Sequence, residues 1–217
     1  EVSEGNTMQA GALDLHVDYK ETYNGELTEN MPYMDLNGAQ LFDLDDVKPG
    51  DWGEMKFSLH VENNPAYLCM EIIPQMNDDM SSTEPELSLA GDDEENADDQ
   101  WDGELMQNIE VNIYNDANEN CSLDVGENST GWIPLTDVVP AEGDTITYDL
   151  SSIGLNAIEN SEDYYVGVKW RIPKDVGNVI QTDALEMDIG FRAVQQRHVS
   201  SSTEIVNGSF ESPGVDD

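Results

Sequence analysis

Strict alternation of apolar and polar residues constrains the fold of this chain more than any other feature. In segment 185–193, apolar Leu185, Met187, Ile189, Phe191 and Ala193 alternate with Glu186, Asp188, Gly190 and Arg192. A period of two turns one side of a strand to a core and the other to water, as in a half-buried antiparallel sheet. The pattern recurs in residues 13–19, 55–61, 68–72, 109–113 and 164–172, and a shorter strand is expected at 145–150.

Turn-forming residues separate these segments at 48–51, 63–65, 142–144 and 176–178. About seven strands with such spacing are typical of a sandwich or jelly roll. Helical signals are limited to residues 98–106 and 149–160. We therefore predict an all-β protein, a jelly-roll-like antiparallel β-sandwich that occupies residues 10–198 as one domain with few short helices. Residues 77–100 are expected to be a long acidic loop, and residues 199–217 a C-terminal tail.

The charge of the chain is extreme. Eight Lys and Arg stand against 47 Asp and Glu, a net charge of −39. Hydrophobic residues still make up 38% of the chain, which is enough for a core and argues against global disorder. Nucleic acids and anionic membranes are excluded as partners, because binding them requires cationic groups. Acid dispersed along the whole chain resembles the proteins of salt-loving archaea, in which molar salt screens the self-repulsion.

Several features suit an exported, cell-surface or extracellular protein. No run of about 18 apolar residues predicts a transmembrane helix, so no membrane insertion is expected. No signal peptide is present, and a start at Glu1 fits a processed N-terminus. Cys69 and Cys121 permit one disulfide bond, although two unpaired buried thiols explain them equally well. Three sequons for N-glycosylation occur, at Asn120, Asn128 and Asn207.

The N-terminal region carries a family resemblance. Residues 6–15, NTMQAGALDL, resemble the N-x-F-x-A-G-x-L-D-L signature of the TasA/camelysin family, with Met8 in place of Phe. The turn at 46–51 with the strand after it, and the strand within 181–195, look like later landmarks of the same family. The match runs in order over roughly residues 5–198.

This resemblance implies a secreted jelly-roll subunit of biofilm-matrix fibres, a homopolymer assembled head to tail. In such fibres the N-terminal segment of one subunit fills a groove in its neighbour's sheet. In this chain the donor segment, within residues 1–9, would comprise Val2, Ser3, Glu4, Gly5, Asn6, Thr7 and Met8. Pairing between chains satisfies an open sheet edge, and a contact that does not close on itself gives a filament. Residues 203–210 are a second candidate donor.

Residues 116–127 have the spacing of a calcium-binding loop. The expected oxygen ligands are Asp116, Asn118, Asn120, Ser122, Asp124 and Glu127. The sixth position, normally Gly, is Cys121, and strands rather than helices flank the loop. Two interpretations stay open: calcium as a cofactor at a site unlike the helix-flanked one, or an Asx-rich turn without an ion, as is common in acidic proteins. A glycan on Asn120 would compete with calcium.

No catalytic motif is present, so the chain is not expected to be an enzyme. The histidines, His16, His60 and His198, lie outside any H-E-x-x-H motif, and no G-x-S-x-G elbow occurs. His16 and His60 are expected on the polar faces of their strands.

The four tryptophans bear on a second function. Trp170 is in phase with a core stripe, whereas Trp52 and Trp132 adjoin turns. Packing in the core or at a subunit interface is favoured for Trp52, Trp101, Trp132 and Trp170. A row of solvent-facing tryptophans would instead favour the alternative function, a monomeric secreted calcium-stabilised adhesin or carbohydrate-binding β-sandwich.

Overall fold

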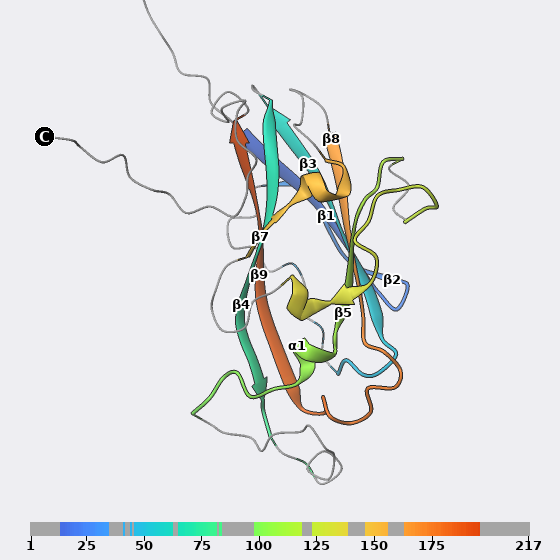
Figure 1. Ribbon diagram of the computed structural model, residues 1–217, viewed down its shortest axis with the longest axis vertical. Helices are drawn as coiled ribbons and strands as arrows, with labels where there is room; N and C mark the ends of the chain where they lie inside the picture. The colour runs from blue at the N-terminus through green and yellow to red at the C-terminus, as the bar shows by residue number, and fades with distance from the viewer. Residues whose placement is uncertain are drawn as a thin grey trace, which may run out of the picture.

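Two antiparallel sheets form the protein. The computed structural model describes residues 14–34, 41, 44, 46–62, 65–81, 83, 98–118, 123–138, 146–155 and 163–195. The larger sheet contains, in spatial order, β2 (Glu26–Met34), β1 (Asp14–Tyr23), β3 (Trp52–Glu62), β8 (Asp163–Arg171), β5 (Glu110–Asn115) and β6 (Ile133–Pro134). The smaller sheet contains β7 (Ile146–Asp149), β4 (Ala66–Asp79) and β9 (Asp183–Gln195). The predicted all-β, sandwich-type fold is confirmed (Figure 1).

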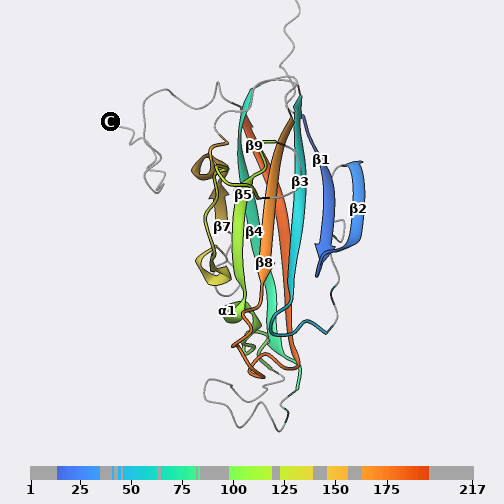
Figure 2. The same cartoon turned by 90° about the vertical axis from the view of Figure 1, so that its right-hand side faces the viewer.

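The chain passes repeatedly from one sheet to the other. After β3 in the larger sheet comes β4 in the smaller one, then β5 and β6 in the larger, β7 in the smaller, β8 in the larger and β9 in the smaller. This alternation gives the sandwich its jelly-roll-like character. Figure 2 looks onto the larger sheet, with β4 and β9 of the smaller sheet behind it. Long strands that are consecutive in sequence are therefore rarely neighbours.

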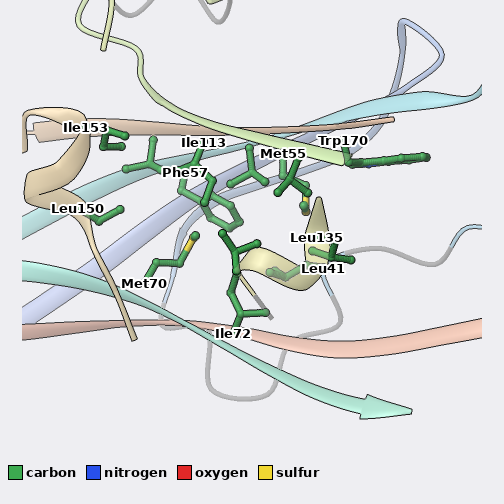
Figure 3. Packing of buried hydrophobic residues seen from close by; sticks show 14 of the residues in the cluster. Leu41, Met55, Phe57, Met70, Ile72, Ile113, Leu135, Leu150, Ile153 and Trp170 are labelled. Atoms are coloured by element: carbon green, nitrogen blue, oxygen red, sulfur yellow. The ribbon is translucent and has the colours of Figure 1, made fainter. Parts of the chain in front are cut away.

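The apolar faces predicted from alternation meet between the sheets. Met55, Phe57 and Leu59 of β3 are buried on the side that faces Met70 and Ile72 of β4 (Figure 3). Burying a side chain of this size stabilises the fold by about 1.5–3 kcal/mol. The buried residues of β8, which pairs with β3, and of β5, which pairs with β8, continue the same layer.

The boundary predicted at residue 77 is wrong, because β4 continues to Asp79. Alternation persists there, but the inward residues are polar: Asn77 and Asp79 are both buried. Asn77 accepts a hydrogen bond from the Met106 backbone N–H at 3.0 Å through Oδ1 and donates to the Gly103 carbonyl. These bonds satisfy a polar side chain that a hydrophobic pattern cannot detect.

The strand β2 has no counterpart in the sequence predictions. It joins β1 through a turn at Asn24 and Gly25, both with positive φ (49° and 87°), as two-residue hairpins prefer. Most of the described side chains of β2 are exposed. An edge strand exposed on both faces has no reason to alternate.

Helix is scarce, as predicted. The one α-helix among the described residues is α1 (Leu105–Asn108), at the end of the predicted 98–106 segment. Two 3-10 turns, η1 (Leu135–Asp137) and η2 (Leu150–Ile153), complete the elements, and η2 lies within the predicted 149–160 segment. No helix of the described residues is long and apolar enough to span a membrane.

Candidate functional site

The most distinctive feature of the sandwich is the open edge of its smaller sheet. Within the part of the chain that the structure describes, β9 pairs with β4 along its length and with no other strand. It is 13 residues long. The outer N–H and C=O groups of such an edge are a template for another strand.

The core is incompletely covered along β9. On β4 the inward side chains are fully buried: Leu68 is 1% exposed, Met70 0% and Ile72 4%. Their cross-strand neighbours on β9, Ala193, Phe191 and Ile189, face the same core but are only half-buried. One strand further out, the same apolar layer is thus partly exposed.

The larger sheet extends beyond the point where the smaller one ends. Phe191 of β9 packs edge-on against Phe57 of β3, with ring centroids 4.9 Å apart, so β9 faces β3. Beyond β3 the larger sheet continues with β1 and β2, whereas β9 is the last described strand of the smaller sheet. We call this region, between β9 and the β1–β2 hairpin, the open flank (Figure 2).

Two buried polar atoms lie on the β1 side of the open flank. Tyr19 Oη and one carboxylate oxygen of Glu21, Oε1, have no hydrogen-bond partner among the described residues. Burial raises the pKa of Glu21, and neighbouring Glu29 adds to the effect, although a 2.7 Å hydrogen bond from Thr28 Oγ1 opposes it. Unpartnered buried polar groups are unfavourable, so a segment that reached them would be stabilised.

The predicted donor residues Val2 to Met8 lie outside the described residues, as does the alternative donor at 203–210. The structure therefore describes the acceptor side of the predicted contact alone.

The calcium-loop prediction is only partly addressed, because Asn120 and Ser122 lie outside the described residues. Asn118 donates to Asp124 Oδ2 at 2.9 Å, and the Asp124 backbone N–H donates to Glu127 Oε2 at 2.9 Å. Three of the predicted ligands are thus brought together, while Asp116 is buried at the end of β5. No group of three or more His, Cys, Asp or Glu side chains among the described residues is placed to hold a metal. Calcium binding stays a prediction.

The disulfide prediction also stays open. Cys69 is half-buried on β4, and burial raises the pKa of its thiol. Cys121 lies outside the described residues. Of the sequons, Asn128 is exposed, whereas Asn120 and Asn207 lie outside the described residues.

His60 tethers three strands on the outer face of the larger sheet. Its Nδ1 lies 2.6 Å from Asp163 Oδ1 on β8, and its Nε2 lies 3.2 Å from Asp18 Oδ2 on β1. His16 is its cross-strand partner, so both lie on the polar face, as predicted. The His60 ring is thus engaged by two carboxylates in a structural contact.

The tryptophan prediction holds for Trp170, which is 7% exposed. Trp52 and Trp132 are 44% and 39% exposed, so core packing is wrong for them, and packing at a subunit interface stays a prediction. Both line a cleft that sequence reasoning missed. One signal of this cleft was present in the sequence. Three of the few basic residues, Lys169, Arg171 and Lys174, lie within six positions of one another, and all three line the cleft.

Comparison with protein-family models gave no match, and comparison with curated proteins gave none either.

Proposed function

We propose that this chain is the non-catalytic subunit of a secreted, extracellular filament, in which residues 1–8 of one copy add as a strand to β9 of the next. The supporting observation is the contrast in burial across the smaller sheet. The inward residues of β4 are fully buried, and those of β9 are half-buried on an edge with which no other described strand pairs. Calcium at the 116–127 loop and glycans at the sequons belong to the same proposal.

The dimensions of donor and acceptor are compatible. Eight extended residues span about 26 Å, and the 13 residues of β9 span about 43 Å. Val2 and Met8 are separated by an even number of positions, so both fall on one face of an extended segment. That face would cover the apolar residues of β9, and each inter-strand hydrogen bond would contribute about 0.5–1.5 kcal/mol.

The charge of the subunit sets the conditions for assembly. Each copy carries −39, so copies repel one another in dilute buffer. At molar salt the Debye length falls to about 3 Å, which removes repulsion between all but touching charges. Filaments are therefore expected at molar salt and not in dilute buffer.

Negative-stain electron microscopy in molar salt tests the proposal. Full-length protein is expected to form filaments, and a variant that lacks residues 1–8 is expected to remain monomeric. On the acceptor side, Met187→Glu places a charge on the half-buried face of β9 and should also abolish filaments. The matched control is Glu186→Gln, on the exposed face of the same strand, which should leave filaments intact.

Other outcomes are equally informative. Filaments that survive removal of residues 1–8 but vanish on removal of residues 199–217 would move the donor to the C-terminal tail. Circular dichroism of Met187→Glu must show the parent β-signal, since otherwise its loss of filaments reports unfolding. A full-length protein that stays monomeric in molar salt would overturn the filament proposal.

A second function has its own supporting observation. The exposure of Trp52 and Trp132 favours a monomeric adhesin or carbohydrate-binding β-sandwich stabilised by calcium. This alternative takes the place of the filament if the microscopy shows monomers alone.

A further inference from the structure

A cleft of about 500 Å³ lies at one end of the larger sheet. It gathers three of the eight basic residues of the chain and three of its four tryptophans: Lys169, Arg171, Lys174, Trp52, Trp132 and Trp170. On a protein with 47 acidic residues this concentration of positive charge is unusual. Its volume lies within the range of about 300–1,000 Å³ typical of small-ligand sites.

Strand register places the exposed aromatic rings on either side of a fixed arginine. Trp52 of β3 is the cross-strand partner of Arg171 on β8, and Arg171 is in turn the partner of Glu110 on β5. The Arg171 guanidinium carbon lies 4.1 Å from the centroid of the Trp132 ring. Glu110 Oε2 accepts from Arg171 Nε at 2.7 Å and lies 2.6 Å from Nη2. Two of the five N–H donors of Arg171 are thus engaged, and among the described residues none is seen to accept from the other three.

Trp52 is held from its backbone, which leaves its indole exposed. Its N–H donates to Asn24 Oδ1 at 3.1 Å, and its carbonyl accepts from the Asn24 N–H at 2.9 Å. The β1–β2 turn therefore fixes the position of Trp52. An exposed indole that is already ordered binds a flat apolar surface with little loss of conformational entropy.

The cleft carries positive charge that the described carboxylates do not cancel. Lys56 and Lys169 share one carboxylate, that of Glu54, at 3.3 and 3.4 Å. Lys174 is exposed and forms no ion pair with any carboxylate that the structure describes. The stem of Lys174 lies against Gly50, where a Cβ would come within 3.2 Å of Lys174 Cγ, so its direction is constrained.

We infer that this cleft binds a carboxylated carbohydrate, a uronic-acid sugar, whether or not the chain assembles. The exposed indole of Trp52 offers a flat apolar surface to the C–H face of a pyranose ring, while the Trp132 ring has one face against Arg171. Lys174 lies where it can pair with the sugar carboxylate, and the available N–H groups of Arg171 can donate to hydroxyl oxygens. The open shape of the cleft suits a segment within a polysaccharide.

The charge balance favours such a sugar over an acidic peptide. Glu54, Glu110 and Asp175 lie in or beside the cleft and would repel a run of carboxylates. Lys56, Lys169, Arg171 and Lys174 exceed these three carboxylates by one positive charge, which matches the single carboxylate of one uronic-acid ring.

Binding of short galacturonic-acid oligosaccharides to the full-length protein in molar salt tests the inference, with tryptophan fluorescence and calorimetry as readouts. We expect binding that Trp52→Ala and Lys174→Gln each weaken by about tenfold or more. Lys20→Gln, on an exposed lysine of β1, is the matched control and should bind like the parent. The parent should bind neutral galactose oligosaccharides more weakly than the acidic probe. Lys174→Gln should bind the neutral and the acidic oligosaccharides equally.

Three results would overturn the inference. One is the absence of binding by the acidic oligosaccharide to a protein with the parent circular dichroism spectrum. Another is binding that Lys174→Gln and Trp52→Ala leave unchanged. A third is preferential binding of a synthetic peptide of residues 92–99, which would make the cleft a contact for an acidic peptide. None depends on filament formation, so this inference and the proposed function fail independently.

Discussion

Close contact between Gly167 and Tyr114 fixes the spacing of β5 and β8. A Cβ at Gly167 would lie 2.0 Å from carbon atoms of the Tyr114 ring, which is fully buried over β8. The Tyr114 hydroxyl donates to Glu54, and Lys169 lies 5.4 Å from the Tyr114 ring centroid. The glycine therefore makes room for a ring that orders the charges beside the cleft.

Gly167→Ala is expected to lower the free energy of unfolding by about 1–3 kcal/mol, because a methyl group has no space under the ring. Gly190→Ala on β9 is the matched control, since nothing lies within 4 Å of a Cβ there and its φ is not positive. It should change stability by less than about 0.5 kcal/mol. Chemical denaturation at constant molar salt measures both, and an equal loss in the two variants would contradict the steric explanation.

Asp183 is a second residue whose environment affects stability, in this case through its pKa. Burial raises its pKa to about 7, helped by the charges of Glu104 and Asp79 and opposed by hydrogen bonds from backbone N–H groups, including that of Glu104 at 2.6 Å. Since the pKa in the folded state is higher than in the unfolded chain, ionisation of Asp183 disfavours folding. This destabilisation is absent at acidic pH, grows as the pH rises toward 7, and is complete above it.

Asp183→Asn should therefore match the parent in stability near pH 4 and exceed it increasingly toward pH 8. The amide oxygen retains the acceptor for the Glu104 N–H, while the charge is removed. Urea denaturation across this pH range at constant salt provides the measurement. Asp188→Asn, on an exposed residue of the same strand, controls for the loss of one negative charge. Parallel pH curves for parent and Asp183→Asn would contradict the argument.

At the scale of elements, the alternation of apolar and polar residues predicted the strands that bury one apolar face. It did not predict strand segments that lack such a face. β8 and β9 were predicted closely because apolar residues occupy every second position. In β8 these include Val166, Val168 and Trp170, and in β9 they include Met187 and Ile189. β2 was missed because it is exposed on both faces. The end of β4 was missed because its inward residues are polar and are satisfied by hydrogen bonds from distant segments.

The candidate sites were less accessible from sequence for a similar reason. The open edge of β9 is a property of sheet order, and alternation does not say which strands are neighbours. The cleft depends on the register that sets Trp52 beside Arg171, which joins positions far apart in the chain. The spacing of Lys169, Arg171 and Lys174 was visible in the sequence. Which tryptophans lie beside these residues in the fold could not be predicted from it.

At the scale of the whole molecule, the net charge is expected to control stability. With −39 on one chain, lowering the salt from about 1 M to 0.1 M lengthens the Debye length from about 3 to 10 Å and restores repulsion between distant carboxylates. The thermal midpoint should fall steeply over this range, as followed by circular dichroism. Sucrose in place of salt should not restore it, because sucrose does not screen charge. Full recovery in sucrose would show that preferential exclusion, rather than screening, stabilises the fold.

The passage of the chain between the two sheets also sets the order in which the molecule can form. β4 finds its long partner only in β9, so that Ala66 pairs with Gln195 and Asp79 with Asp183. The smaller sheet is thus incomplete until β9 has been synthesised, whereas β1, β2 and β3 can pair earlier. Chains dominated by such distant pairings fold slowly, on the order of milliseconds to seconds. During that time dispersed negative charge keeps unfolded copies apart, so the acidity that opposes compaction also protects a late-folding chain from aggregation.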